Sequence, residues 1–213
     1  GALVWSGDIK SSFPSMKNQV AAGLNMGIAG IPWWTTDIGG FFGANINDPE
    51  FHELLVRWFE YGCFCPVMRL HGYRWPLQPQ YGTTGGATCV SGAPNEVWSY
   101  TDQVCEILSD YLRLRERMLP YITELMEEAH EKGTPVMRPL FYDFPEDKES
   151  WNVETEYMFG PKVLVKPITD ADARETDVYL PGGASWTNAW TGETFEGGQK
   201  VHVAAPIEQI PLF

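Results

Sequence analysis

The sequence is poor in basic residues, and this shortage excludes two classes of partner. Among 213 residues, 15 Lys and Arg stand against 28 Asp and Glu, which gives a net charge of −13. A nucleic-acid-binding face needs clustered cations, so no nucleic-acid partner is expected. An anionic membrane surface is disfavoured for the same reason. No apolar run reaches the ~20 residues that a membrane-spanning helix needs, so no membrane partner is expected either.

Cysteine is also scarce, and the four cysteines lack the spacing of a metal site. They form no C-x-x-C pair, and no His lies at zinc-finger distance from them, so neither a metal nor an organic cofactor is expected. We interpret all four as small buried thiols: Cys63, Cys65, Cys89 and Cys105.

An initiator Met and a signal-peptide pattern are missing as well. The chain begins in a strand-like run at Leu3 and stops on an apolar run at Phe213. We therefore expect a fragment of a longer protein. For a soluble protein, these features leave the cytoplasm and the periplasm both open.

Aromatic residues, by contrast, are abundant. Hydrophobic residues make up 44% and aromatic residues 14% of the chain, with 9 Trp, 9 Tyr and 11 Phe. This supply is ample for a large core and excludes intrinsic disorder. Exposed Trp and Tyr rings also suit the apolar faces of sugars, although composition alone favours a packed core.

Strands and helices are expected to alternate through the first 72 residues. The expected elements are, in chain order, a strand over 3–5, a helix over 12–25, a strand over 27–34, a helix from 48 and a strand over 64–70. Ser12 and Asp48 are candidate N-caps, and Pro49 fits the first helical position. Such alternation predicts a parallel β/α architecture.

The middle of the chain reads as a long loop followed by a long helix. Residues 73–94 are rich in Gly, Pro and Thr, and loops of this length are typically functional lids or disordered insertions. A helix is expected over 96–132, kinked or divided by Pro120 and ended by Gly133.

After Gly133 the sequence changes to short strands separated by turn signals. Strands are expected over 136–142, 157–159, 163–167, 177–180, 186–190, 194–195 and 201–204. This pattern predicts a small antiparallel β-sandwich domain over 134–213, distinct from a β/α domain over 1–133.

Charged residues follow each of the three early strands: Asp8, Asp37 and the pair Arg69 and His71. The carboxyl ends of parallel strands meet at one rim, where active sites of such folds lie. Aromatic residues flank these positions, namely Trp5, Trp33, Trp34 and Phe41. Carboxylates among aromatic rings favour sugar binding or glycoside cleavage.

Each of these residues also has a structural interpretation. Asp8 fits a turn or a helix cap, and Asp37 fits a turn in which it bonds its own backbone. Trp33 and Trp34 fit a core. The recurrence of polar groups at successive strand ends favours function, because a turn explanation must be invoked separately each time.

Three motifs carry a resemblance to a known family. They are Trp-Ser-Gly-Asp at 5–8, Trp-Thr-Thr-Asp-Ile-Gly-Gly-Phe at 34–41 and Met-Arg-Leu-His-Gly at 68–72. Together with 138–140 and 157–160, they resemble glycoside hydrolase family 31, which holds retaining α-glucosidases and α-xylosidases. The resemblance implies an α/β fold: the C-terminal part of a (β/α)8 TIM barrel, followed by a small antiparallel β-sandwich domain.

The resemblance also implies roles for these residues. Asp8 matches the general acid/base, and Asp37 and His71 match groups that hydrogen-bond sugar hydroxyls. Arg69 matches a polar residue of the same rim. The pocket aromatics would be Trp5, Trp34 and Phe41. The run over 31–37 looks most like bacterial α-xylosidases that trim xyloglucan, which makes an oligosaccharide the expected substrate.

A retaining glycosidase needs two carboxyl groups about 5–5.5 Å apart, a nucleophile and an acid/base. The resemblance places the nucleophile on an earlier barrel strand that this sequence does not contain. We therefore expect this chain to be inactive alone and to need the N-terminal remainder of the same enzyme as its partner. An α-glucosidase, or a non-catalytic carbohydrate-binding protein, is the alternative; residues 134–213 fit a structural role.

Overall fold

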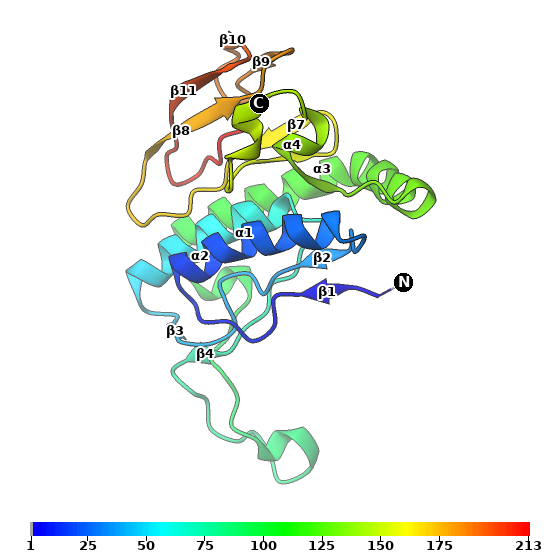
Figure 1. The fold of residues 1–213 in the computed structure, drawn as a ribbon. Coiled ribbons are helices and arrows are strands. Elements are labelled where there is room, and N and C mark those ends of the chain that lie inside the picture. The colour runs from blue at the N-terminus through cyan, green and yellow to red at the C-terminus, as the bar shows by residue number, and fades with distance from the viewer. Residues whose placement is uncertain (1) are drawn as a thin grey trace.

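A computed structural model describes residues 2–213 and arranges them in layers (Figure 1). Strands β1 (Val4–Trp5) and β2 (Trp34–Thr35) lie on one side. Helices α1 (Phe13–Ile28), α2 (Pro49–Cys63) and α3 (Asp102–Lys132) form the middle of the molecule. The C-terminal strands lie beyond the helices, which therefore separate the two β regions. No helix of the described residues is both long and apolar enough to cross a membrane.

The early strands are parallel, as expected for a β/α barrel. β1 pairs with β2 through Val4 with Trp34 and Trp5 with Thr35. A further parallel bridge joins Ile38 to Leu70. The segments that follow the three expected strands are therefore neighbours at one edge.

The predicted helix starts are confirmed by their caps. The Ser12 side chain accepts a hydrogen bond from the Ser15 backbone N–H, and Asp48 accepts one from Glu50. Each cap satisfies a backbone donor that the first helical turn leaves unpaired.

Two of the expected strands are much shorter than predicted. α1 continues to Ile28, so residues 27–28 are helical. Of the expected 27–34 strand, only Trp34 lies in β2, which ends at Thr35. Helical burial continues through Gly27, which packs closely against Pro135 and leaves no room for a side chain. Over 64–70, only Leu70 forms a bridge, because α2 runs to Cys63 and turns follow it.

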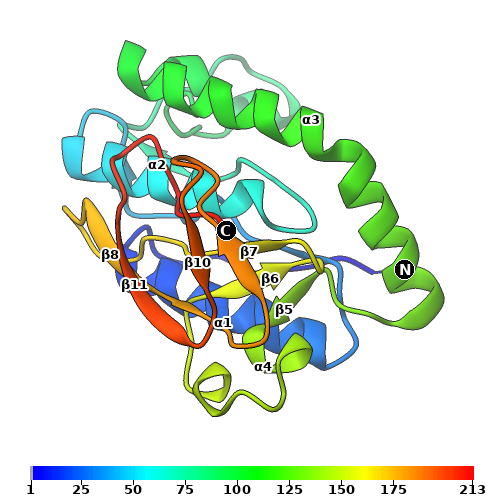
Figure 2. The ribbon, with the colours of Figure 1, turned by 90° about the horizontal axis from the view of Figure 1, so that it is seen from above.

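Helix α3 begins at Asp102, later than predicted, because Thr101 caps it by accepting from the Val104 N–H. The preceding residues form a separate 3-10 helix, η2 (Val97–Ser99). α3 is not divided at Pro120, although its axis bends along its course (Figure 2). Gly133 ends it in the left-handed conformation, with φ 73°, as predicted.

The expected loop over 73–94 contains some regular structure. β4 (Arg74–Trp75) pairs in parallel with β3 (Ala44–Asn45), and a 3-10 turn, η1, spans Gly85–Thr88. Beyond β4, the loop projects away from the layers and then returns to the body (Figure 1).

The C-terminal strands are antiparallel, as predicted. The elements are β5 (Met137–Pro139), α4 (Leu140–Asp143), η3 (Lys148–Trp151), β6 (Tyr157–Phe159), β7 (Val163–Val165), β8 (Glu175–Leu180), β9 (Ser185–Thr187), β10 (Thr194–Glu196) and β11 (Gln199–Ala204). β5, β6 and β7 form one sheet, while β8 pairs with β11 and β9 with β10. The expected 136–142 strand is wrong after Pro139, where α4 begins.

Strand β6 joins two hydrophobic cores. Its alternating side chains point to opposite faces, so Tyr157 and Phe159 enter the core shared with the helices, whereas Met158 enters the core of the C-terminal strands. Cys63 and Cys65 are buried as expected. Cys89 is exposed in the projecting loop and Cys105 is only partly buried, so the prediction of four buried thiols is wrong for these two.

Candidate active site

Backbone hydrogen bonds hold the three rim segments side by side. The Phe41 N–H donates to the Ile9 carbonyl at 2.7 Å, and the Tyr73 N–H donates to the Phe41 carbonyl at 2.5 Å. The Ile38 N–H donates to the Arg69 carbonyl at 3.3 Å. The segments that follow β1, β2 and Leu70 therefore form one continuous rim.

Asp37 is the buried centre of this rim, with 0% of its surface exposed. Arg69 donates from Nη2 to its Oδ1, and the Asp37 backbone N–H donates to Ser6 Oγ at 3.1 Å. Its other carboxylate oxygen, Oδ2, is buried and has no hydrogen-bond partner among the described residues. A buried acceptor left unpaired is costly, so this oxygen is available to a donor that a ligand brings.

Burial raises the pKa of Asp37 above its ordinary value. The charges of Arg69 and His71 act in the opposite direction, and the Arg69 hydrogen bond also lowers this pKa. Asp8 adds to the upward shift by like-charge repulsion. The other three residues predicted from the strand ends therefore all lie close enough to Asp37 to influence its pKa.

The other rim side chains surround Asp37 with less burial. Asp8 and His71 are exposed, and Phe41 is partly buried. The Phe41 and His71 rings lie 5.6 Å apart between centroids, tilted by 36°. Trp5 is 51% exposed on β1. The arrangement thus combines an exposed carboxyl, suited to proton transfer, with a buried carboxylate and an imidazole, suited to binding hydroxyls.

The structure does not bring Trp34 to this rim. Its side chain is 3% exposed and belongs to the core shared with the helices. The ring packs on α1 so closely that a Cβ at Gly23 would lie 2.7 Å from Trp34 Nε1. Trp34 therefore lies in the hydrophobic core, in agreement with its structural interpretation.

Two rim residues escape reasoning from the sequence. Ser6 lies inside the Trp-Ser-Gly-Asp motif, yet only the fold shows that its hydroxyl accepts from the Asp37 backbone. Arg74 is completely buried and donates to the carbonyls of Ile38 and Gly40, which follow Asp37, and to the carbonyl of His71. No periodicity marks either residue, because the contacts join separate segments. Within residues 2–213, no group of three His, Cys, Asp or Glu side chains is placed to hold a metal ion.

Carboxylates at the ends of parallel strands, backed by helices and an antiparallel β domain, define the class of barrel glycoside hydrolases. The chain belongs to glycoside hydrolase family 31. The model of the family's TIM-barrel domain matches residues 1–125, and the model of its C-terminal domain matches residues 133–213. The fold inferred from the motifs is therefore confirmed.

Relatives include glycosidases with two named specificities. The chain is 38% identical to an alpha-xylosidase of Saccharolobus solfataricus, over 100% of the chain and 26% of that protein. It is 35% identical to alpha-glucosidase 2 of Bacillus thermoamyloliquefaciens, over 100% of the chain and 24% of that protein. A crystal structure of a GH31 alpha-xylosidase from a soil metagenome, complexed with xylose, superposes with a TM-score of 0.95 at 54% identity, over 100% of this chain and 32% of that one. The chain thus spans only a quarter to a third of these relatives.

Proposed function

We propose that this chain forms the C-terminal part of the catalytic barrel of a retaining exo-α-glycosidase, with Asp8 as the general acid/base. The observation that carries the proposal is the state of Asp37. This carboxylate is fully buried, yet it keeps Oδ2 unpaired beside Arg69. Such an oxygen suits a sugar hydroxyl, which forms a short, charge-assisted hydrogen bond with a carboxylate.

In this proposal, the residues divide the chemistry between them. Asp8 protonates the leaving oxygen while a carboxylate of the upstream part of the enzyme attacks the anomeric carbon. Water then enters, with Asp8 acting as the base. Asp37 and His71 bind sugar hydroxyls, and the charge of Arg69 opposes the rise that burial causes in the pKa of Asp37.

Two of the three predicted pocket aromatics stay in the proposal. Trp5 and Phe41 stay in the proposal as apolar walls, because Trp5 is exposed and the partly exposed Phe41 ring lies beside His71. Trp34 is left out, since its ring is buried against α1.

Residues 134–213 would support the barrel. Tyr121 Oη of α3 donates to the Phe159 carbonyl at 2.8 Å, and Tyr157 Oη donates to the Phe64 carbonyl at 3.0 Å. These bonds lock the C-terminal sheet onto the helical layer. We place the domain boundary at Gly133, where α3 ends.

For the substrate, we propose an oligosaccharide with a terminal α-linked xylose, and α-linked glucose as the alternative. The 31–37 run and the similarity to the soil-metagenome alpha-xylosidase support xylose. Rates of the full-length enzyme on nitrophenyl α-xyloside and nitrophenyl α-glucoside decide between them.

A non-catalytic carbohydrate-binding protein is the second candidate, since an exposed Trp5 and the free Asp37 oxygen would serve it equally well. It requires that the upstream sequence lack a carboxylate at the nucleophile position. Reading that sequence separates the two candidates.

The direct test of the enzyme proposal is Asp8→Asn in the full-length protein. Removing a general acid slows poor leaving groups by about 10²–10⁴-fold, while activated aryl glycosides, which need little protonation, lose much less. Asp110→Asn, an exposed position on α3, is the control. An unchanged rate on substrates with poor leaving groups would contradict the assignment. We also expect residues 1–213 alone to cleave neither nitrophenyl α-xyloside nor nitrophenyl α-glucoside, because the proposed nucleophile belongs to the upstream part of the enzyme.

A further inference from the structure

We propose that Arg74 is a positioning residue that holds segments 37–41 and 71–75 in register and so controls how Asp37 and His71 meet the sugar. The inference rests on the proposed function of the rim. Arg74 has 0% of its surface exposed and lies on β4, which pairs with β3.

The Arg74 guanidinium contacts backbone carbonyls of both rim segments at once. Nη1 donates to the Gly40 carbonyl at 2.8 Å, and Nη2 donates to the Ile38 carbonyl at 3.1 Å. Nη2 also reaches the His71 carbonyl at 3.5 Å. Two carbonyls that follow Asp37 and the carbonyl of His71 are therefore bound to one rigid, planar group.

Arg74 has no carboxylate within ion-pair distance among the described residues. All of its acceptors are uncharged, and its Nε donates to Asn95 Oδ1 at 3.1 Å. Burial lowers the pKa of Arg74, which reflects the cost of keeping its charge away from water. Burying a cation without a counterion costs free energy. Stability therefore does not explain why Arg74 is buried beside the rim, and a role in positioning does.

The family motifs make room for this guanidinium. A Cβ at Gly39 would lie 2.9 Å from Arg74 Nη2, and a Cβ at Gly72 would overlap the guanidinium itself. Phe51 covers another side, with its ring centroid 4.9 Å from Arg74 Cζ. The glycines after Asp37 and His71 thus form the slot in which Arg74 lies.

Asn95 connects Arg74 to the returning end of the projecting loop. Its Oδ1 accepts from Tyr100 Oη at 2.5 Å as well as from Arg74 Nε. The Ala93 N–H also donates to the Arg74 carbonyl at 2.9 Å. The returning end of the loop is therefore fastened to the residue that sets the rim.

The test compares Arg74→Lys with Arg115→Lys in the full-length enzyme. Arg115 is a matched control, because it too donates to three backbone carbonyls, at 2.6–2.8 Å, but on the segment that precedes the rim. Lys keeps the positive charge but lacks the planar guanidinium that donates to several carbonyls at once. Misplacement of a binding group by about 1 Å costs about 10²-fold, so we expect Arg74→Lys to lower kcat/KM by about 10–100-fold. Arg115→Lys should lower the unfolding temperature and leave kcat/KM unchanged.

A double mutant separates positioning from general damage. If Arg74 acts through Asp37, Arg74→Lys should cost far less in an Asp37→Asn background than in the wild type. Full additivity, or a kcat/KM for Arg74→Lys that matches the Arg115 control, would overturn the proposal. If Arg74→Lys does not fold, Asn95→Ala removes the acceptor that Arg74 Nε shares with Tyr100 Oη, leaves the Arg74 bonds to the rim carbonyls in place, and is measured in the same way. An unchanged kcat/KM for that variant then counts against the proposal.

Hydrogen exchange gives a readout that does not need activity. Arg74→Lys should speed amide exchange over 37–43 and 70–75 relative to the Arg115 control. A full-length wild type that cleaves neither glycoside would refute the proposed function, and the exchange rates would still show whether Arg74 holds the rim. An active wild type with unchanged exchange in Arg74→Lys would refute the positioning role alone.

Discussion

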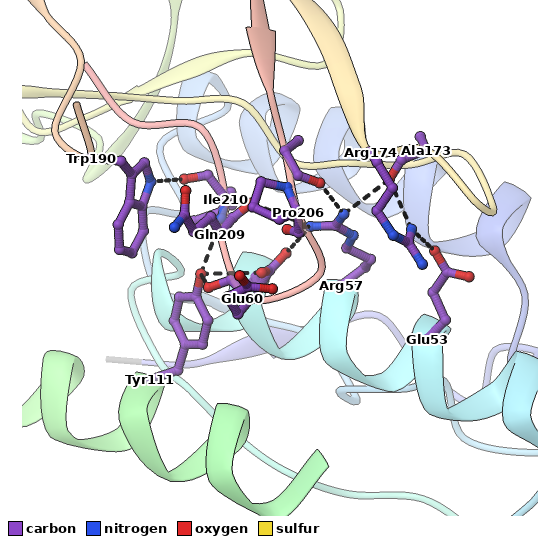
Figure 3. A network of polar contacts seen from close by, with 12 residues as sticks. Glu53, Arg57, Glu60, Tyr111, Ala173, Arg174, Trp190, Pro206, Gln209 and Ile210 are labelled. Atoms are coloured by element: carbon purple, nitrogen blue, oxygen red, sulfur yellow. Dashed lines mark hydrogen bonds and ion pairs between the residues drawn. The ribbon is translucent and has the colours of Figure 1, made fainter. Parts of the chain in front are cut away.

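Two buried carboxylates, each paired with one arginine, serve the molecule in different ways. Glu60 and Asp37 are both 0% exposed. Glu60 uses both oxygens, since Arg57 Nη1 donates to Oε2 at 3.1 Å and Tyr111 Oη lies 3.1 Å from Oε1 (Figure 3). Asp37 receives Arg69 on one oxygen only and leaves the other unpaired.

The two arginines differ in the same way. Arg57 is fully buried between α2 and the C-terminal domain and also donates to four backbone carbonyls, those of Ala173, Ala205, Pro206 and Gln209. The Arg69 side chain is 39% exposed. The comparison teaches that an ion pair whose carboxylate has both oxygens hydrogen-bonded (a saturated pair) closes an interface. A pair whose carboxylate keeps one oxygen unpaired (an unsaturated pair) keeps bonding capacity for a ligand.

The largest effect on stability is expected at the saturated pair. Arg57→Met leaves Glu60 and four carbonyls buried without their donor, which should cost about 3–5 kcal/mol of unfolding free energy. Denaturant unfolding of the full-length protein measures it. The exposed pair partner Arg113 is the control, because Arg113→Met should cost at most about 1 kcal/mol. Equal losses of unfolding free energy in Arg57→Met and Arg113→Met would contradict a special structural role of the buried pair.

At the unsaturated pair, the expected effect falls on catalysis. Asp37→Asn removes the charge that receives sugar hydroxyls, and a hydrogen bond to a charged group contributes about 1.5–3 kcal/mol, or roughly 10–100-fold in kcat/KM. Stability should change less than in Arg57→Met, because the exposed Arg69 regains water. A variant that keeps full activity but unfolds easily would reverse the assigned roles of the two pairs.

The last predicted effect is a pH dependence that belongs to Glu60. Burial raises the pKa of Glu60 to about 8, against the opposing pull of Arg57. Because the folded state then binds more protons than the unfolded one, stability contributed by this residue falls as pH rises from about 4.5 to about 8. Unfolding free energies measured at pH 5 and pH 8 should therefore differ less in Glu60→Gln than in the wild type. An identical slope in both proteins would place the dependence elsewhere.

Local signals predicted much of the fold. Ser12, Asp48 and Gly133 end or begin helices through bonds to residues a few positions away, so their patterns are visible in the chain itself. Errors arose where packing extends an element. The first residues of the strand expected at 27–34 belong to α1 instead, because the buried face of this helix continues to Gly27, which contacts Pro135.

The sequence by itself determined the family, through three spaced motifs, and with it the candidates Asp8, Asp37, Arg69 and His71. Only the tertiary structure decided that Trp34 faces α1, that Asp37 keeps one oxygen unpaired and that Arg74 clamps the rim. The physical reason is separation along the chain. Arg74 and Gly40 are 34 positions apart, and a contact between such residues leaves no periodic trace in either segment.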